Sequence, residues 1–583
     1  MLHTLTRSLR ENKGPALVTV LLSALEVVFE IVIPLFMSNL IDFGIEGGSM
    51  AAVWKFGAFL LLLAAFQLAT GVLAARIAAR ASVGFAANLR EDMYDNVQTF
   101  AFSNIDKFST ASIVTRLTTD TTNVQNAFQM LMRMAIRAPV MLIFSMIVSF
   151  RISRDISMTF LIILPILALA LFFIIRSVFP VFTRVFRTYD ELNNVVQENV
   201  RGIRVVKSFN QERHEIGKFG AISERIYKDF SKGERLITLN APLMQSCIYT
   251  CMIIISWLGA KAIIASGNDP ALGLTTGNLT ALITYAMQIL SSLMMLSMVF
   301  AMLTISLSSA RRIAEVLEER SDIPQPEQPV MTVRDGAVDF DHVSFVYASK
   351  ADKKVLDDID LHIRSGETIG IIGGTGASKS SLVQLIPRLY DVTGGKLTLG
   401  GVDVREYDLD TLRGAVAMVL QKNELFSGTI AENLRWGNEN ATDEQLRHAC
   451  KLACADEFIS AMPDGYDTHI EQGGTNVSGG QKQRLCIARA LLKKPKVLIL
   501  DDSTSAVDTR TDAQIQQALS TYIPDTTKII IAQRISSVQN ADRIVVLDDG
   551  RINAVGSHDE LLRSCEIYRE VYESQQKGGE DDA

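Results

Sequence analysis

The 583-residue sequence has few of the residues that build disulfide frameworks or metal sites, namely six cysteines and seven histidines. Six cysteines in a chain of this length do not form a disulfide framework. Cys247 and Cys251 lie four residues apart on a segment expected to be helical, as do Cys450 and Cys454. No histidine pair accompanies either cysteine pair, so small core residues explain them better than a metal site.

The sequence also lacks an excess of positive charge and a secretory cleavage site. The formal net charge is −7, which gives no reason to expect nucleic acid as a partner. Arg7, Arg10 and Lys13 precede the first long apolar run, as basic residues do in a signal peptide. No small-residue cleavage site follows that run, so we expect it to be retained as a membrane helix.

Long apolar runs are what the sequence has in quantity, and 48% of its residues are hydrophobic. The chain is too long for one domain. Six runs in its first half are long and apolar enough to cross a bilayer of about 30 Å. They lie near residues 16–40, 56–76, 135–152, 156–176, 243–265 and 279–305.

Charge in the gaps between these runs predicts their orientation. The gaps near 77–134 and 177–242 carry many basic residues, whereas 41–54 and 266–278 contain no lysine or arginine. The positive-inside rule then places both termini and the long gaps in the cytoplasm. We therefore expect a multi-pass protein of the inner or plasma membrane. Apolar residues at helical spacing, as in residues 191–198, predict that the membrane helices extend far into the long gaps.

Two carboxylates interrupt the first apolar run. Glu26 and Glu30 lie one helical turn apart on the same face. Intramembrane carboxylates are costly and face a cavity or a partner. Two interpretations stay open: a polar, cation-tolerant lining of a translocation path, or a structural role, as an internal pair with a base such as Arg137 or as a protonated glutamic acid packed between helices.

The composition changes at residues 321–334, where three prolines fall within six residues. They end the last apolar helix and predict a stiff, extended link. From about residue 335, short apolar strands alternate with helical segments, as in an α/β fold. The sequence therefore predicts a membrane domain (1–320), a linker (321–334), an α/β domain (335–575) and an acidic tail (576–583).

A glycine-rich turn in the second half predicts a phosphate site. It follows the apolar run Ile369–Ile372 and precedes a helical segment that begins near Leu382. Backbone N–H groups of such a turn, together with the helix dipole, favour an anion. Lys379 would reach the outer phosphates and the Ser380 hydroxyl would ligate Mg²⁺. The turn comprises Gly373, Gly374, Thr375, Gly376, Ala377, Ser378, Lys379, Ser380 and Ser381.

Ser378 stands where the usual pattern of this turn has glycine. If the position needs a positive φ, serine costs about 1–2 kcal/mol of strain. If the position is helical, serine costs almost nothing. We expect the helical conformation, because serine is a preferred residue at helix N-termini.

A second buried strand, Val497–Leu500, ends at Asp501 and Asp502. Ligands of open α/β sheets bind at the carboxyl ends of the strands, so these carboxylates should lie near the phosphate loop. One Asp can hold the Mg²⁺ shell, and a second acid can orient attacking water.

A second phosphate-binding segment begins at Ser478 and continues through Gly479, Gly480 and Gln481 into a helix. One domain cannot wrap both segments around one nucleotide if they lie on separate faces. A second such domain, supplied by a partner chain, resolves this difficulty.

These motifs resemble the ATP-binding cassette (ABC) family over essentially the whole chain. The resemblance implies a six-helix membrane bundle of the type I exporter kind, followed by an α/β P-loop nucleotide-binding domain with ATP and Mg²⁺ as cofactors. It makes Tyr347 the residue that stacks on adenine, Gln421 the glutamine that touches Mg²⁺, and Asp501 the Mg²⁺-side aspartate. Ser478–Gln481 become the signature motif that completes a partner's ATP site, and Ser505–Asp508, with Asp508 at its end, become the loop that crosses the dimer.

Three departures from the family pattern bear on the activity. Asp502 replaces the catalytic glutamate, Gln533 replaces the switch histidine, and Ser378 replaces the loop glycine. A misplacement of about 1 Å can cost on the order of a hundredfold in rate, and aspartate is one methylene shorter than glutamate. Glutamine cannot carry the positive charge of a protonated histidine. Deliberate mutation of an active protein is an alternative origin for Ser378 or Asp502.

Intact signature and altered catalytic positions together resemble the degenerate-site subunit of bacterial heterodimeric multidrug exporters. The resemblance implies an ATP-hydrolysing transporter whose partner is a second, non-identical half-transporter. Its substrate would be an amphipathic small molecule, lipid or peptide in contact with membrane lipid. Two rival hypotheses are a homodimeric lipid flippase and a non-transporting ATP-sensing subunit.

Overall fold

A computed structural model describes residues 1–270, 273–347, 354–503 and 506–580. The chain divides into two compact units. The first contains Met1–Gln98 and Thr110–Glu319, and the second contains Thr99–Ser109 and Arg320–Ala583.

The first unit confirms the six expected membrane segments. Among the described residues, six helices are long and apolar enough to cross a membrane. They are Arg10–Glu46, Met50–Gln98, Thr110–Ile152, Arg154–Arg201, Glu212–Ser266 and Thr276–Glu318. The gaps near 77–134 and 177–242 are largely helical, as predicted, because the membrane helices continue through them.

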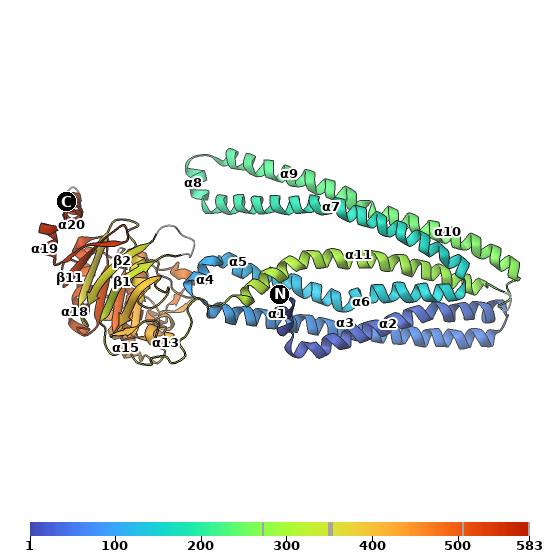
Figure 1. Ribbon diagram of the computed structural model, residues 1–583, viewed down its shortest axis with the longest axis horizontal. Coiled ribbons are helices and arrows are strands. Elements are labelled where there is room, and N and C mark those ends of the chain that lie inside the picture. Colours follow the sequence, from blue (N-terminus) through green and yellow to red (C-terminus); the bar gives the residue numbers. More distant parts are fainter. Residues whose placement is uncertain (271–272, 348–353, 504–505, 581–583) are drawn as a thin grey trace. The chain divides into compact units, whose positions relative to one another are not determined.

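These helices form two groups within the first unit (Figure 1). Helices α2 (Lys13–Asn39), α3 (Met50–Gln98), α6 (Thr121–Ile152) and α11 (Thr276–Glu318) pack against one another. Helices α7 (Arg154–Arg201) and α9 (Glu212–Thr238) form a hairpin through the short α8 (Ile203–Ser208), and α10 (Asn240–Ser266) continues α9.

Buried side chains and two polar anchors fix the first group. Val27, Ile31 and Met141 pack with Tyr285, which is fully buried. The Tyr285 hydroxyl donates to the Ile31 carbonyl oxygen at 2.6 Å. At the far end, Asp42 accepts the Gly277 backbone N–H at 2.8 Å, which satisfies one of the unpaired donors at the start of α11.

The second unit is built on three sheets, with strand orders β2-β1-β4-β5, β12-β11-β3-β10-β9-β6 and β7-β8. In the six-stranded sheet β11, β3, β10, β9 and β6 are parallel, and β12 is antiparallel. The strands are β1 (Val338–Phe345), β2 (Leu356–Ile363), β3 (Thr368–Gly373), β4 (Gly394–Leu399), β5 (Val402–Asp403), β6 (Val416–Val419), β7 (Gly428–Thr429), β8 (His469–Ile470), β9 (Val497–Asp501), β10 (Thr527–Ile531), β11 (Arg543–Asp548) and β12 (Arg551–Gly556).

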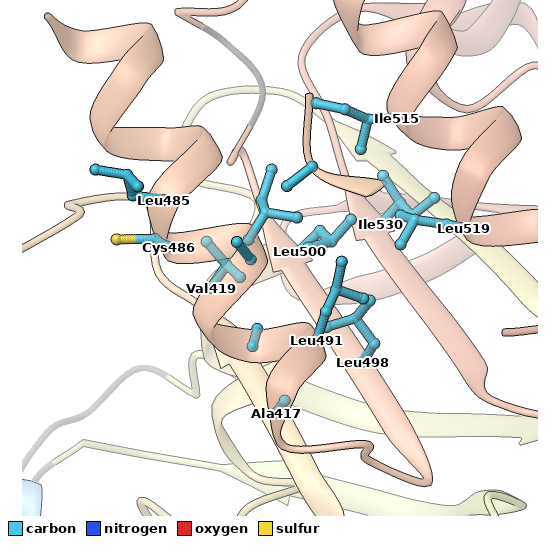
Figure 2. Close-up of a cluster of buried hydrophobic side chains, with 14 of the residues drawn as sticks. Ala417, Val419, Leu485, Cys486, Leu491, Leu498, Leu500, Ile515, Leu519 and Ile530 are labelled. Atoms are coloured by element: carbon cyan, nitrogen blue, oxygen red, sulfur yellow. The ribbon is translucent and has the colours of Figure 1, made fainter. Parts of the chain in front are cut away.

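Helices pack on the six-stranded sheet, as expected for an α/β fold, and further helices pack on those helices. The α-helices after β3 are α12 (Lys379–Gln384), α13 (Leu409–Ala415), α14 (Ile430–Arg435), α15 (Asp443–Leu452), α16 (Asp456–Ser460), α17 (Gly479–Leu492), α18 (Thr509–Tyr522), α19 (His558–Ser564) and α20 (Glu566–Glu580) among the described residues. Figure 2 shows side chains of α17 and α18, among them Leu485, Leu491 and Ile515, gathered with Val419 and Leu500 of the strands. The carboxyl ends of β3 and β9 are therefore held at one edge of the sheet.

Two segments depart from the simple order of domains along the chain. Residues 99–109, which the sequence placed in the membrane domain, cluster with the second unit. The reason is α4 (Phe102–Lys107): Phe102 packs edge-on against Tyr390 at 5.9 Å, and the Tyr390 hydroxyl donates to Asp106 at 2.8 Å. In addition, α20 continues to Glu580, so the expected tail at 576–583 begins inside a helix; residues 581–583 lie outside the described part of the chain.

Candidate nucleotide site

The predicted phosphate loop connects β3 to α12. At its start Gly373 allows a close approach of two strands, since a Cβ there would lie 2.2 Å from the Leu547 carbonyl oxygen. The Lys379 ammonium donates to the carbonyl oxygens of Gly373 at 2.8 Å and Gly374 at 2.9 Å. Burial lowers the pKa of Lys379, while the carboxylates of Asp502 and Asp501 act against this shift. The loop thus curls around its own lysine, with backbone N–H groups available for an anion.

The expectation that Ser378 is helical is wrong. Its backbone has φ 66° and ψ 23°, the left-handed conformation, and its side chain makes no capping hydrogen bond. Gly376 two residues earlier has φ +85°, so the loop turns twice through a region that suits glycine. A serine in this conformation costs about 1–2 kcal/mol relative to glycine. Serine is favoured at helix starts reached from extended chain, and here the loop curls into the helix instead.

The carboxylates at the end of β9 and directly after it lie beside the phosphate loop, as predicted from the end of a parallel strand. The Ser380 hydroxyl donates to Asp501 at 3.0 Å. Asp501 is only 3% exposed, and this burial raises the pKa of its carboxyl group, although the Ser380 hydrogen bond opposes the shift. Hard cations such as Mg²⁺ prefer oxygen ligands. The adjacent oxygens of Ser380 and Asp501 therefore fit the predicted metal position.

The Asp502 side chain is hydrogen-bonded to Gln533 and Gln421. Its Oδ2 accepts a hydrogen bond from Gln533 Nε2 at 2.7 Å and one from Gln421 Nε2 at 3.3 Å. Its backbone φ of +47° is unusual for a residue other than glycine. The Gln421 amide follows β6, and Gln533 follows β10, so three neighbouring strands deliver these side chains to one place.

Tyr347, predicted to stack on adenine, lies next to the phosphate-loop helix. It follows β1, is 43% exposed, and its hydroxyl is 2.7 Å from Ser381 Oγ. Its ring packs edge-on against Phe345 at 4.8 Å and Tyr390 at 5.1 Å. A partly exposed aromatic face beside a phosphate loop can accept a flat base. Tyr390 contacts both Tyr347 and α4, and no local sequence pattern marks it.

The predicted signature segment begins α17 with a capping box. Ser478 is extended at φ −68° and ψ 159°, and its Oγ accepts the Gln481 N–H at 3.2 Å. The Gln481 side chain in turn accepts the Ser478 N–H at 2.9 Å. A Cβ on Gly480 would lie 2.9 Å from the Ala506 carbonyl oxygen, so glycine is needed there, whereas Gly479 has ordinary space.

The segment expected to cross a dimer follows β9. Ser505 lies outside the described residues, but Ala506 donates its backbone N–H to Gln483 of α17 at 3.0 Å. Asp508 caps α18, because its carboxylate accepts the Thr511 N–H at 3.0 Å. This backbone hydrogen bond lowers the pKa of Asp508. The signature helix and this segment are thus joined directly.

In the membrane unit, Glu26 and Glu30 share one base. Arg137 of α6 donates to Glu26 at 2.8 Å and to Glu30 at 2.7 Å. The internal pair, one of the two sequence interpretations, is therefore present. Glu30 and Arg137 also line a cavity of about 180 Å³ whose other walls are largely methionine, serine and glutamine. Two carboxylates and one guanidinium leave one formal negative charge when all are ionised.

Two family models match the chain. Residues 16–294 match the ABC transporter transmembrane region, and residues 356–505 match the ABC transporter domain. YfiB of Bacillus subtilis (strain 168), described as an uncharacterized ABC transporter ATP-binding protein, is 35% identical over 558 residues, which cover 96% of each chain. The chain belongs to the ABC transporter family.

Other similar proteins agree with this membership. This ABC transporter is 33% identical over 580 residues to the uncharacterized ABC transporter ATP-binding protein Rv1273c of Mycobacterium tuberculosis (strain ATCC 25618 / H37Rv), covering 99% of this chain and 98% of that one. A solved structure of a bacterial Atm1-family ABC exporter with ATP bound has a TM-score of 0.80 at 24% identity, covering 97% and 98% of the two chains. The fold is therefore that of an ABC exporter half, with a multi-pass membrane domain and an ATP-binding domain that in this family hydrolyses ATP.

Proposed function

We propose that this ABC transporter is one half of a heterodimeric, ATP-driven exporter of amphipathic drugs, lipids or peptides. It contributes an impaired ATP site of its own and an intact signature motif to the site of a second, non-identical half. Both termini and the nucleotide-binding domain are assigned to the cytoplasm, on the charge pattern of the gaps.

One observation carries this proposal. Asp502, at the position that should activate water, accepts two amide hydrogen bonds, from Gln533 and Gln421. Both donors are neutral amides, and neither can accept and return a proton in the way that a histidine can. By contrast, the signature helix has a complete cap and the glycine that its contact with Ala506 requires.

At its own loop the chain is equipped to bind rather than to hydrolyse. Lys379 and the loop N–H groups would hold the phosphates, while Ser380, Gln421 and Asp501 would hold Mg²⁺. Bound Mg²⁺ supplies charge neutralisation of the phosphates. The side chain of Asp502 is one methylene shorter than that of glutamate. Its carboxylate would therefore form a weaker hydrogen bond with the attacking water. ATP is therefore expected to stay bound through many cycles.

Hydrolysis takes place mainly at the partner's loop against Ser478 and Gly480 of this chain. Closure of the two cassettes on ATP turns the membrane half outward, and hydrolysis resets it. Asp508 and the neighbouring residues that join α17 supply the connection between the two sites.

For the substrate path we propose the cavity beside Glu30 and Arg137. Methionine side chains adapt to ligands of different shape. The surplus of one carboxylate in the Glu26, Glu30 and Arg137 cluster favours substrates that carry a positive charge. The hydrogen bonds from Arg137 offset part of the cost of burying the two carboxylates inside an apolar helix bundle.

Co-purification tests the proposal. The tagged chain, extracted from its native membranes, should bring down a second ABC half-transporter in equal amount, identified by mass spectrometry. That partner should carry a glutamate and a histidine at the positions of Asp502 and Gln533. Recovery of this chain alone, as a dimer with brisk ATPase activity, would contradict the proposal and favour a homodimeric flippase.

A further inference from the structure

The C-terminal helix α20 reaches the segment that carries Gln533. The Gln575 side chain of α20 donates its Nε2 to the Gln533 carbonyl oxygen at 2.7 Å. Its Oε1 accepts the Ile535 backbone N–H at 2.9 Å. One amide side chain thus satisfies the peptide groups on both sides of Arg534.

Helical spacing explains how Gln575 arrives there. Tyr568, Tyr572 and Gln575 are four and then three residues apart, so they share one face of α20. Tyr568 is 0% exposed, and its hydroxyl is 2.7 Å from His558 Nδ1 of α19. Tyr572 packs against the core beneath the six-stranded sheet. The buried tyrosines therefore set the rotation of the helix, and Gln575 follows from it.

Residues 533–535, which Gln575 contacts, also carry the Gln533 side chain that is hydrogen-bonded to Asp502. Gln533 Nε2 lies 2.7 Å from Asp502 Oδ2, beside the end of the phosphate loop. A second anchor lies further along, where the Ser537 hydroxyl donates to Asp512 at 2.6 Å. Gln533 is exposed, and the Gln575 bridge restrains the backbone between its buried neighbours Ala532 and Ile535.

We infer that Gln575 is a positioning residue of the ATP site, which acts through the backbone of Gln533 to hold its amide against Asp502. Water can replace the exposed hydrogen bond to the Gln533 carbonyl oxygen, whereas the bond from the Ile535 N–H is partly buried, so the loss of both lowers the free energy of unfolding modestly. What is lost is the fixed direction of the Gln533 side chain. The inference rests on the assignment of Gln533 in the proposed function, but not on the identity of the partner.

Binding of ATP and ADP to the purified full-length chain tests this inference. ATP carries a terminal phosphate that ADP lacks, and in the proposed function Asp502 and Gln533 would face that phosphate. Gln575→Ala should weaken Mg-ATP binding about threefold to tenfold, the loss expected for one or two hydrogen bonds, and leave Mg-ADP binding unchanged. Gln576→Ala is the matched control, because Gln576 donates to the Tyr572 hydroxyl on its own helix, at 2.6 Å. It should leave both affinities unchanged.

Two further variants keep the test decisive. Gln533→Ala should reproduce the selective loss, and adding Gln575→Ala to it should cost nothing more, since both act through one contact. Gln575→Glu retains the shape of the side chain but faces the Gln533 carbonyl oxygen with an acceptor in place of a donor, and should give an ATP-selective loss at least as large as that of Gln575→Ala.

Equal weakening of ATP and ADP, or no change in either, would overturn the role of Gln575. Additive losses in the double variant would overturn it as well. If the single chain instead hydrolysed ATP briskly while the ATP-selective loss remained, the proposed function would fall and this inference would stand.

Discussion

Two helices of the nucleotide-binding domain begin with serine at a phosphate-binding segment, and they begin in opposite ways. Ser378 before α12 is left-handed, with φ 66°, and its side chain caps nothing. Ser478 before α17 is extended, with φ −68°, and forms a reciprocal capping box with Gln481. The same residue type is strained in the first case and suited to its place in the second.

The difference lies in the backbone that precedes each helix. The phosphate loop must curl back on itself, and Gly376 already uses a positive φ before Ser378 does. The chain enters α17 from an extended residue, where a serine side chain can reach the N–H of the third residue. The local rules for serine are therefore kept at the start of α17 and broken at the start of α12. Natural proteins break such rules at functional or strained sites.

The largest expected effect comes from a substitution at the start of α17, the helix with the capping box. In the complex with its partner, Gly480→Asp should lower ATPase activity on the order of a hundredfold, because a misplaced segment near the reacting phosphate costs about that much. The added side chain would meet the Ala506 carbonyl oxygen, 2.9 Å from its Cβ. Asp502→Asn should lower activity only a few-fold. ATPase rates of the two variant complexes check this, and a larger loss from Asp502→Asn would reverse the assignment of the two sites.

A second prediction repairs the strained helix start. Ser378→Gly removes the cost of a left-handed serine and should raise the free energy of unfolding of the nucleotide-binding domain by up to about 1–2 kcal/mol. Ser378→Ala is the control, because it removes the hydroxyl and keeps the strain. Thermal unfolding of the full-length chain measures both. An equal gain in the alanine variant would show that the hydroxyl, and not the backbone, destabilises the loop.

A third prediction concerns the membrane unit, where Arg137 is paired with the two acids Glu26 and Glu30. Glu26→Gln with Glu30→Gln changes the formal charge of the cluster from one negative to one positive and should reduce transport of cationic substrates a few-fold more than that of neutral ones. Basal ATPase activity should be kept. Transport by the reconstituted complex, measured with a cationic and a neutral dye, gives the ratio. An equal loss for both dyes would assign the cluster to packing alone.

The smallest predicted effect concerns pH at the chain's own site. Burial raises the pKa of Asp501, so its carboxyl group takes up a proton at a higher pH than an ordinary aspartate does. A protonated carboxyl group cannot ligate Mg²⁺, so the gain in ATP affinity from Mg²⁺ should decline as the pH falls from neutral toward that pKa. ATP binding without Mg²⁺ should change less. Asp501→Asn should abolish the pH-dependent difference; a difference that persisted would place the titrating group elsewhere.

The sequence was sufficient wherever a local pattern dictated the structure. Apolar runs predicted the six membrane helices, and the glycine-rich turn and the acids after β9 predicted the phosphate edge of the sheet. Arg137 was foreseen only as one of two alternatives for Glu26 and Glu30, since spacing along α2 does not say what faces it. The conformation of Ser378 was predicted wrongly, because it depends on the curl of the whole loop.

Contacts between distant residues left no local pattern. The interaction of α4 with Tyr390 joins residues 284 apart in the sequence, as the hydrogen bond from Tyr390 to Asp106 shows. Gln575 reaches Ile535 across 40 residues. In each case an ordinary polar or aromatic residue gains its role from the way distant elements pack, which one sequence does not reveal.

We propose that Asp502 and Gln533 limit the rate of ATP hydrolysis at this chain's own site. The most direct test is the ATPase rate of the purified single chain, before and after the combined substitutions Asp502→Glu and Gln533→His. The account predicts very slow hydrolysis by the original chain and a rise of at least about tenfold in the substituted one, because a longer carboxylate and a protonatable ring restore general acid–base chemistry. Rapid, concentration-dependent hydrolysis by the original chain, with no gain on substitution, would contradict it.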